Sequence, residues 1–390
     1  MSSMFFKPTF ATLIAIFVCA CYPKFDLSAK YDNTESSKPY EGEPGESEPE
    51  EDESLLDFGS YKMSDRIDIP QKDGIPRKGY WLDGKITAFK PSWDKNRFVL
   101  FWSADASLMQ TGLRTPWLED NINDLKEEMA VIGNSVNPQK GFTDGGQWFI
   151  GVHELSGGKL AGFFHAESHW PNQSGAYKSI GVSYSDDRGK TWTRGDKILS
   201  GNEPKPETSD NDGRSYGLGD GCVVWNPEKS LWICYYSGFC PETHDFCITM
   251  AASADPEGKA GTWKKWDGKD FTLEGCDPQT GLGGTNVAIE PLGAYHGGNP
   301  SVMFNTGRKE WMMVYHSWQR NIIFSKSKDG VTWEKPMVII GTSLEKGGAM
   351  YPNMIGENGD MQGGDSFRLY YSADMVNGIR KLCYRKVRLK

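Results

Sequence analysis

Two stretches of the chain repeat one pattern: residues 220–236 are DGCVVWNPEKSLWICYY and residues 299–315 are NPSVMFNTGRKEWMMVY. Each stretch is an apolar strand, a turn rich in Asn, Gly, Pro and Lys, and a second apolar strand, which is typical of a β-hairpin. The copies align without a gap, so that four landmarks correspond: Asp220 with Asn299, Asn226 with Asn305, Trp232 with Trp311, and Tyr236 with Tyr315. A hairpin that recurs along the chain predicts repeated sheets.

The end of the second strand recurs five times, as FWSAD, FFHAE, YYSGF, VYHSW and YYSAD, at Phe101–Asp105, Phe163–Glu167, Tyr235–Phe239, Val314–Trp318 and Tyr370–Asp374. Five units of four strands predict an all-β, five-bladed β-propeller over residues 58–390. Such a ring closes by pairing the chain ends, so we expect the last strand, Lys381–Leu389, to pair with the first blade. A short helical insertion is expected between the first two units, at Trp117–Ile132.

Composition agrees with a large β domain and limits the partners. The 390 residues are 13% aromatic and include 45 Gly, which excludes a disordered chain, a coiled coil and a multi-span membrane protein. The net charge of −9 arises from residues 41–57, which carry nine acids and no Lys or Arg, so acids and bases balance elsewhere. A domain without basic excess is not expected to bind nucleic acid.

The first 21 residues have the pattern of a lipoprotein signal peptide. Lys7 precedes the apolar run FATLIAIFVCA, and Val18-Cys19-Ala20-Cys21 resembles a bacterial lipobox with Cys21 as the lipidated residue. A short buried strand is the alternative. Residues 22–57 are rich in Ser, Glu, Pro and Gly and predict a disordered acidic tether. We therefore expect a monomer outside the cytoplasm, periplasmic or at the cell surface, whose membrane contact is the lipid anchor.

Cysteine positions suggest disulfides, because an exported chain meets oxidising conditions. Cys240 and Cys247 bracket the loop PETHDF, and Cys222 and Cys234 lie on two adjacent predicted strands. Both pairs are candidate bridges. No cysteine or histidine cluster has the spacing of a structural zinc site.

Turns rich in Ser, Asp, Gly and Trp follow three of the hairpins. Ser185–Trp192 fits the Asp-box pattern S-x-D-x-G-x-T-W, Ser327–Trp333 is one residue shorter, and Ser253–Trp263 is an expanded form. The sequence thereby resembles the sialidase and five-bladed glycoside hydrolase superfamilies over residues 80–390. The turn side chains are expected to be structural, with the acids bonding turn amides and the indoles packing between sheets: Asp187, Trp192, Asp329 and Trp333.

The resemblance implies two patterns of active site. Sialidases are six-bladed, which makes a six-bladed propeller the alternative fold, and they bind a carboxylate with three arginines; here Ile75-Pro76-Arg77 does not match the opening motif, and Arg114, Arg214 and Arg320 remain as clamps. Glycosidases of family 43 place two Asp and a Glu at the starts of inner strands. Asp220 occupies such a position, whereas its repeat equivalent Asn299 carries no acid.

Strand direction predicts which residues share one rim. The innermost strand of a blade leaves the rim where the second strand ends, so the start of one and the end of the other lie together, and the Asp-box turns lie on the opposite face. The rim then collects Asp144, His165, Glu167, His169, Asp220, His296, Asn299, His316, Trp318, Tyr351 and Asn353.

This set of side chains suits carbohydrate chemistry. Glycosidic cleavage uses one carboxyl group as an acid and another as a base or nucleophile. We expect Glu167 to be the acid and Asp220 or Asp144 the base, although either Asp fits an ordinary turn. Aromatic rings that stack on sugars are expected at Trp170, Trp318 and Tyr351, and polar substrate contacts at His165, His169, Arg214, His296, Asn299 and His316.

Two other functions fit the same residues. A polysaccharide lyase would use one of the rim histidines as base with Tyr236 or Tyr351 as acid, and Arg114 or Arg214 would neutralise a uronate. A surface glycan-binding propeller would use the rim without catalysis. No nucleotide-binding motif is present, no cofactor is expected, and the axial channel leaves room for a structural calcium ion that no motif supports.

Overall fold

The computed structural model describes residues 55–69, 82–104, 107–121, 141–171, 175–193, 195–209, 217–373 and 380–390. The predicted signal peptide, nearly all of the tether, Arg77 and Arg214 lie outside these residues. The predicted tether ended at Asp57, and a described strand already begins at Leu56. No helix of the described residues is long and apolar enough to cross a membrane.

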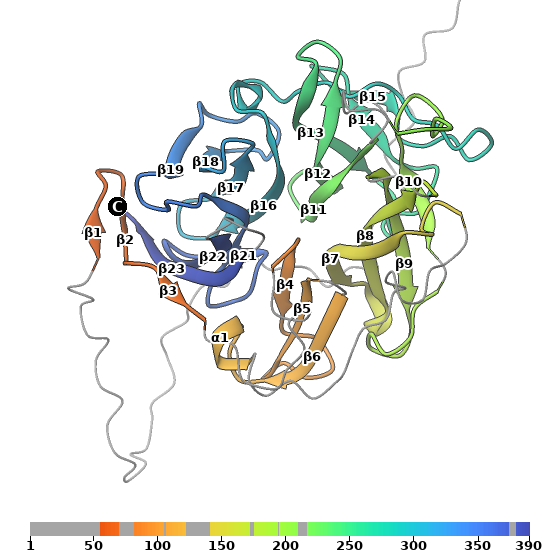
Figure 1. Cartoon of the computed structure of the whole chain (residues 1–390). Helices are drawn as coiled ribbons and strands as arrows, with labels where there is room; N and C mark the ends of the chain where they lie inside the picture. The colour runs from red at the N-terminus through yellow and green to blue at the C-terminus, as the bar shows by residue number, and fades with distance from the viewer. Residues whose placement is uncertain are drawn as a thin grey trace, which may run out of the picture.

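Five sheets surround a central axis in the described chain, as the sequence predicted, which excludes the six-bladed alternative (Figure 1). Each sheet is a blade, and the blades are numbered here in chain order. Blade 1 contains β4 (Ile86–Phe89), β5 (Phe98–Ser103) and β6 (Ser107–Leu113). Blade 2 contains β7 (Gly146–Glu154), β8 (Leu160–His169), β9 (Ala176–Ser185) and β10 (Asp196–Leu199). Blade 3 contains β11 (Leu218–Asn226), β12 (Leu231–Cys240), β13 (Asp245–Ser253), β14 (Lys264–Trp266) and β15 (Phe271–Glu274).

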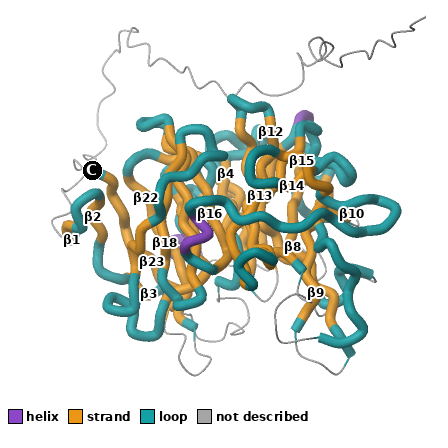
Figure 2. Tube along the Cα trace, turned by 90° about the horizontal axis from the view of Figure 1, so that it is seen from above, coloured by secondary structure: helices purple, strands orange, loops and turns teal. Residues whose placement is uncertain are grey.

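The last two blades use segments that are distant in sequence. Blade 4 contains β16 (Gly297–Asn305), β17 (Glu310–Ser317), β18 (Ile322–Ser327), β19 (Met337–Ile340) and β21 (Gln362–Gly363). Blade 5 contains β20 (Ala349–Ile355), β22 (Ser366–Ala373) and β23 (Lys381–Leu389), together with the N-terminal β1 (Leu56–Asp57), β2 (Tyr61–Met63) and β3 (Ile67–Asp68). Figure 2 shows that the described chain is almost entirely strand and loop.

The chain ends meet as predicted, but the N-terminal partner differs from the prediction. β23 pairs with β2 and β3, which precede the first blade and complete the last one. A buried carboxylate strengthens this closure: Glu345 accepts hydrogen bonds from Arg66 (2.8 Å), Arg385 (2.7 Å) and the Tyr371 hydroxyl (2.6 Å). Both ends of the chain are thus tied to the loop before β20.

The five-residue repeat has a structural reason. Its third residue lies at the end of the second strand of each blade and hydrogen-bonds the backbone of the next blade. The pairs are Ser103 with Phe149, His165 with Asp220, Ser237 with Asn299, His316 with Tyr351, and Ser372 with Leu82. The last pair joins blade 5 to blade 1, so these bonds run once around the ring.

The predicted structural role of the Trp-containing turns agrees with their contacts. Asp187 accepts hydrogen bonds from Ser185 and from the backbone N–H of Thr191, and Asp329 is bonded in the same way by its own turn. Each indole packs on the first aromatic residue of the repeat in the preceding blade: Trp192 on Phe101, Trp263 on Phe163, and Trp333 on Tyr235. Ser185 is level with Leu160, where β8 begins, so these turns lie on the face opposite the predicted site. We call this the turn face, and the face where the innermost strands begin the site face.

One of the two candidate disulfides forms. Cys240 and Cys247 are bridged across the β12–β13 turn, whereas Cys222 and Cys234 are free and buried. Cys222 pairs with Tyr235, and Cys234 with Val223, so the two cysteines are offset by one residue. A one-residue offset places two side chains on opposite faces of a sheet. Cys222 therefore packs toward blade 4 and Cys234 toward blade 2.

The predicted helical insertion is described only at its start. Helix α1 spans Leu118–Asn121, and the rest of the predicted helix lies outside the described residues. Its Glu119 accepts a hydrogen bond from the Tyr370 hydroxyl (2.5 Å) and pairs with Arg368. The insertion thus begins against blade 5.

Candidate active site

Glu167 and Asp220 come from adjacent blades and lie on either edge of one imidazole ring. His165 Nε2 is 3.2 Å from Glu167 Oε1, and its Nδ1 is 3.7 Å from Asp220 Oδ1. On the other side of Glu167, His169 Nε2 is 2.9 Å from Oε2. His165, Glu167 and His169 alternate along β8, so their side chains point to one side of the strand.

A bulge at the start of β11 brings Asp220 into the site. The pairing of β11 with β12 shifts between Gly219 and Gly221, and Asp220 adopts a left-handed conformation with φ of 50°. The bulge removes the Asp220 N–H from the strand ladder. That N–H donates instead to His165 Nδ1 at 3.1 Å. Since Nδ1 accepts this bond, a neutral His165 carries its proton on Nε2 and donates it to Glu167.

Both carboxylates are held ionised. Burial alone would raise the pKa of Glu167, but hydrogen bonds and positive charge from His165, with Lys178 and His169, outweigh it and lower the pKa to about 2. Burial opposes ionisation of Asp220 too, and the charges of Lys178 and His165 hold its pKa far below the usual range. The ammonium of Lys178 is 3.1 Å from Asp220 Oδ2. At neutral pH the site therefore presents two negative charges around His165.

Asp144 has a positioning contact. Its Oδ1 accepts the backbone N–H of His169 at 3.1 Å, and its side chain is exposed. This bond ties the turn before β7 to the end of β8. Asp144 thus sits beside the Glu167 group without contacting Glu167 or Asp220 in the described structure.

A second group of predicted residues lines blades 4 and 5. His316 is fully buried, its Nδ1 accepts the Tyr351 N–H at 3.3 Å, and its ring lies against Trp318 (5.3 Å) and Tyr351 (5.6 Å). Burial lowers the pKa of His316 to about 4 against the opposing charge of Asp220. Asn299 adjoins Asp220 because Ser237 Oγ accepts the Asn299 N–H and donates to the Asp220 carbonyl. Trp318 is 40% exposed, which leaves its indole accessible.

The sequence analysis missed two charged residues of the site, Asp83 and Arg380. Asp83 precedes the innermost strand of blade 1, and Arg380 pairs with it while lying 5.1 Å from the centre of the Tyr351 ring. Burial and then the charge of Asp83 raise the pKa of Tyr351, which places Asp83 beside that ring. The signal was present, because Leu82-Asp83-Gly84 opens an inner strand as Gly219-Asp220-Gly221 does.

The remaining predicted residues make other contacts. His296 precedes β16 at the site face, where its carbonyl accepts the Trp318 N–H at 3.0 Å and its Nδ1 is 3.6 Å from Asp245 Oδ2. Asn353 is buried and bonds Gly84 and Ile86 of blade 1, which is a structural role. Tyr236 is buried and bonds Asn286, and Trp170 is 4% exposed and bonds the Pro206 carbonyl, so neither ring is available to a sugar. Arg114 and Arg320 are exposed.

A cation of the chain itself occupies the axial space below the site. The Lys85 ammonium is 3.3 Å from Asp360 and 3.1 Å from Ser301 Oγ, and both charged side chains are buried. Because blade 5 lies between blades 1 and 4, the Lys85–Ser301 contact crosses the axis. In the described residues, no group of three or more His, Cys, Asp or Glu side chains is arranged to hold a metal ion.

No family model matches the sequence, and no curated protein matches it. Among solved structures, the chain is similar to a family 117 glycoside hydrolase of the marine bacterium Zobellia galactanivorans, with 12% identity and a TM-score of 0.49 over 85% of this chain and 91% of the other. It is also similar to a thermostable family-43 glycoside hydrolase, with 14% identity and a TM-score of 0.43 over 80% and 91% of the two chains. A protein of unknown function from Dyadobacter fermentans matches with 11% identity and a TM-score of 0.40 over 85% and 100%. The five-bladed architecture rests on the sheet topology above, and these likenesses assign no activity to the chain.

Proposed function

We propose that this protein is a glycoside hydrolase that acts on glycans outside the cytoplasm, tethered by a lipid on Cys21. The observation that carries the activity is the convergence of Glu167 and Asp220 on His165 at the site face. Glycosidic cleavage uses a pair of carboxyl groups together with a group that donates a proton. The glycoside hydrolases among similar structures are consistent with this function.

The ionised state of Glu167 changes the role that the sequence predicted for it. A general acid must carry a proton, and the pKa of Glu167 is lowered to about 2. We therefore assign proton donation to His169, which is half exposed and hydrogen-bonded to Glu167. Protonated His169 donates its Nδ1 proton to the glycosidic oxygen while Glu167 holds its Nε2–H. The bond from the anomeric carbon to that oxygen breaks as water attacks the carbon, and Asp220 accepts the proton of the water.

A lyase is the second candidate, because one group of side chains favours it. His316 is buried and neutral above pH 4, and its Nε2 has no hydrogen-bond partner among the described residues, which leaves that nitrogen to accept a proton. Its ring lies 5.6 Å from that of Tyr351, and Arg380 lies over the Tyr351 ring. A neutral imidazole can take the proton beside a uronate carboxylate, and an arginine can neutralise that carboxylate. Elimination would leave an unsaturated sugar that absorbs in the near ultraviolet.

The full chain should be screened against neutral and acidic polysaccharides, with reducing ends and ultraviolet absorbance measured together. We expect new reducing ends without absorbance, and losses of about 100-fold or more in Asp220→Asn and His169→Gln. Products that absorb in the near ultraviolet would show that the protein is a lyase and not a hydrolase. Binding without any product would favour the non-catalytic propeller, and full activity in both variants would refute the assignment.

The lipid anchor is tested separately. Expression in a bacterial host with an alkyne-labelled fatty acid should label the wild-type chain, and Cys21→Ser should abolish both label and membrane association. A labelled Cys21→Ser chain, or an unlabelled wild-type chain, would contradict the anchor without bearing on the hydrolase.

A further inference from the structure

A cavity of about 680 Å³ opens on the turn face, at the end of the axis opposite Glu167 and Asp220. Its walls come from blades 1 to 3 and from the segment between β20 and β22, which includes β21 of blade 4. They include Phe89, Leu155, Trp225, Asn358, Met361 and Gln362. Cavities of roughly 300–1,000 Å³ with aromatic walls and a few polar groups are typical of small-ligand sites.

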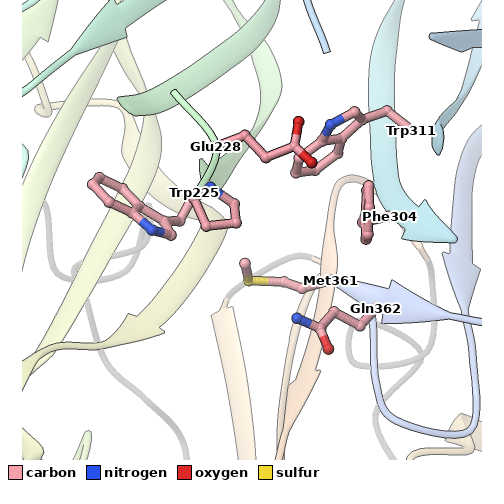
Figure 3. A pocket seen from close by; sticks show the side chains of 7 residues that line it. Trp225, Glu228, Phe304, Trp311, Met361 and Gln362 are labelled. Atoms are coloured by element: carbon pink, nitrogen blue, oxygen red, sulfur yellow. The ribbon is translucent and has the colours of Figure 1, made fainter. Parts of the chain in front are cut away.

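Aromatic rings and planar polar groups meet at the edge of this cavity. A smaller pocket adjoins it and shares Trp225, Met361 and Gln362 with it. Figure 3 shows Met361 and Gln362 between Trp225 on one side and Phe304 with Trp311 on the other, and Glu228 beside them. Trp225 is half-buried, and Trp232, which also lines the cavity, packs edge-on against it with ring centres 5.1 Å apart. A supported, partly open indole beside amide and carboxylate groups can stack on a sugar ring and bond its hydroxyls.

The charges at the cavity favour an uncharged ligand. Lys90 and Glu154 line it together, so the two charges cancel. Glu154 is engaged by the backbone N–H and the hydroxyl of Ser92, and Lys90 lies 4.9 Å from the centre of the Phe98 ring. Glu228 in the adjoining pocket adds a negative charge, so the lining offers no excess positive charge to an anionic ligand, whose desolvation would then be costly.

The cavity is separate from the candidate active site. Trp225 and Asp220 both belong to β11 and are five residues apart, which corresponds to about 16 Å along a strand. Between the two levels, Lys85, Asp360 and Ser301 fill the axial space with hydrogen-bonded side chains. A ligand at Trp225 cannot reach Glu167 through the axis.

We propose that the turn-face cavity is a second, non-catalytic binding site for an uncharged oligosaccharide, with Trp225 as the stacking platform. Only the choice of ligand class rests on the proposed function. A glycan chain bound there would keep the enzyme on an insoluble or polymeric substrate while the site face acts on another segment.

The test uses the full chain in an Asp220→Asn background and an array of immobilised neutral and acidic oligosaccharides of four to eight residues. We expect binding to at least one neutral oligosaccharide, a loss of about tenfold or more with Trp225→Ala, and a smaller loss with Glu228→Ala. Glu228 is exposed and lines the adjoining pocket that shares Trp225, so its variant reports on binding at this edge even where Trp225→Ala fails to fold. Trp318→Ala reports on binding at the site face, and Met337→Ala, an exposed side chain on the outermost strand of blade 4, is the control that should leave all binding unchanged.

Three results would overturn the second site: no oligosaccharide bound, binding confined to acidic oligosaccharides, or binding lost with Trp318→Ala and kept with both turn-face variants. Hydrolysis by the Trp225→Ala chain with Asp220 intact separates this failure from that of the proposed function. We expect the wild-type rate on a short soluble glycan and a lower rate on polymer. A wild-type chain that cleaves nothing refutes the hydrolase, while the array still decides the second site.

Discussion

Replacing Glu345 by Gln tests how the ring is held closed. Glu345 is 2% exposed at its side chain and accepts hydrogen bonds from Arg66, Arg385 and Tyr371, which belong to the N-terminal segment and to two strands of blade 5. Gln keeps the shape but removes the charge. Arg66 bonds one oxygen of Glu345, and Arg385 and Tyr371 bond the other. In Gln, one of these acceptors becomes an N–H₂ donor, which would then face another donor.

The expected cost follows from burial. Removing one member of a buried, hydrogen-bonded ion pair costs about 3–5 kcal/mol, because the remaining charge stays buried without compensation. For a domain of about 330 residues, that loss lowers the midpoint of thermal unfolding by roughly 4–7 °C. The effect should not depend on substrate or on the site face, since Glu345 contacts neither Glu167 nor Asp220.

Calorimetry on the full chain measures this, with Asp57→Asn as the control. Asp57 pairs with Lys390 and also joins the two chain ends, but the pair is exposed, so its loss should leave the midpoint unchanged. A Glu345→Gln chain that melts within about 1 °C of wild type would refute the reasoning. So would an Asp57→Asn chain that loses as much as Glu345→Gln.

Three further predictions concern stability elsewhere in the ring. His153 and His316 are buried and neutral, with pKa values lowered from 6.5 to about 4, mainly by burial. Between these pKa values the unfolded chain binds more protons than the folded chain, so the free energy of unfolding should fall by about 3 kcal/mol per histidine as the pH drops from 6.5 to 4. Urea titration at each pH measures this fall, which should be smaller in a His153→Gln chain. An unchanged dependence on pH in that variant would contradict the prediction. Asp220→Ala should be less stable than Asp220→Asn, by about 0.5–1 kcal/mol in chemical denaturation, because Asn tolerates the left-handed backbone at φ of 50°; equal midpoints would mean that the bulge relaxes. Trp263→Ala should cost about 3–5 kcal/mol, since this indole is 1% exposed, whereas Trp318→Ala should cost far less, and a reversed order would show that the turn indoles do not join the blades.

The five blades could be predicted from the sequence because the five-residue repeat contains the residue that contacts the next blade. The third repeat residue bonds the next blade, so the pattern persists wherever blades adjoin. The spacing of His165, Glu167 and His169 likewise placed three side chains on one side of a strand. These inferences depend on local periodicity, which the sequence displays.

What the sequence could not show depends on register and on long-range charge. The Cys222–Cys234 bridge was wrong because its pairing differs by one residue from the one that would align the two sulfurs. Asp83 had a local signal in Leu82-Asp83-Gly84, but its pairing with Arg380, almost 300 residues away and outside any repeat, could not be predicted. The ionised state of Glu167 depends on Lys178 and two histidines together, a sum that no short pattern contains.

Because β2 completes blade 5, the ring can close only after β23 has been synthesised. Tyr61–Met63 is synthesised about 320 residues before its partner strand Lys381–Leu389. At about 5–20 residues per second, the first strand waits roughly 15–65 s with an unpaired edge. Removal of Lys381–Leu389 would leave β2 and β22 without their common partner, so a nascent chain that stalls before residue 381 cannot form a closed ring.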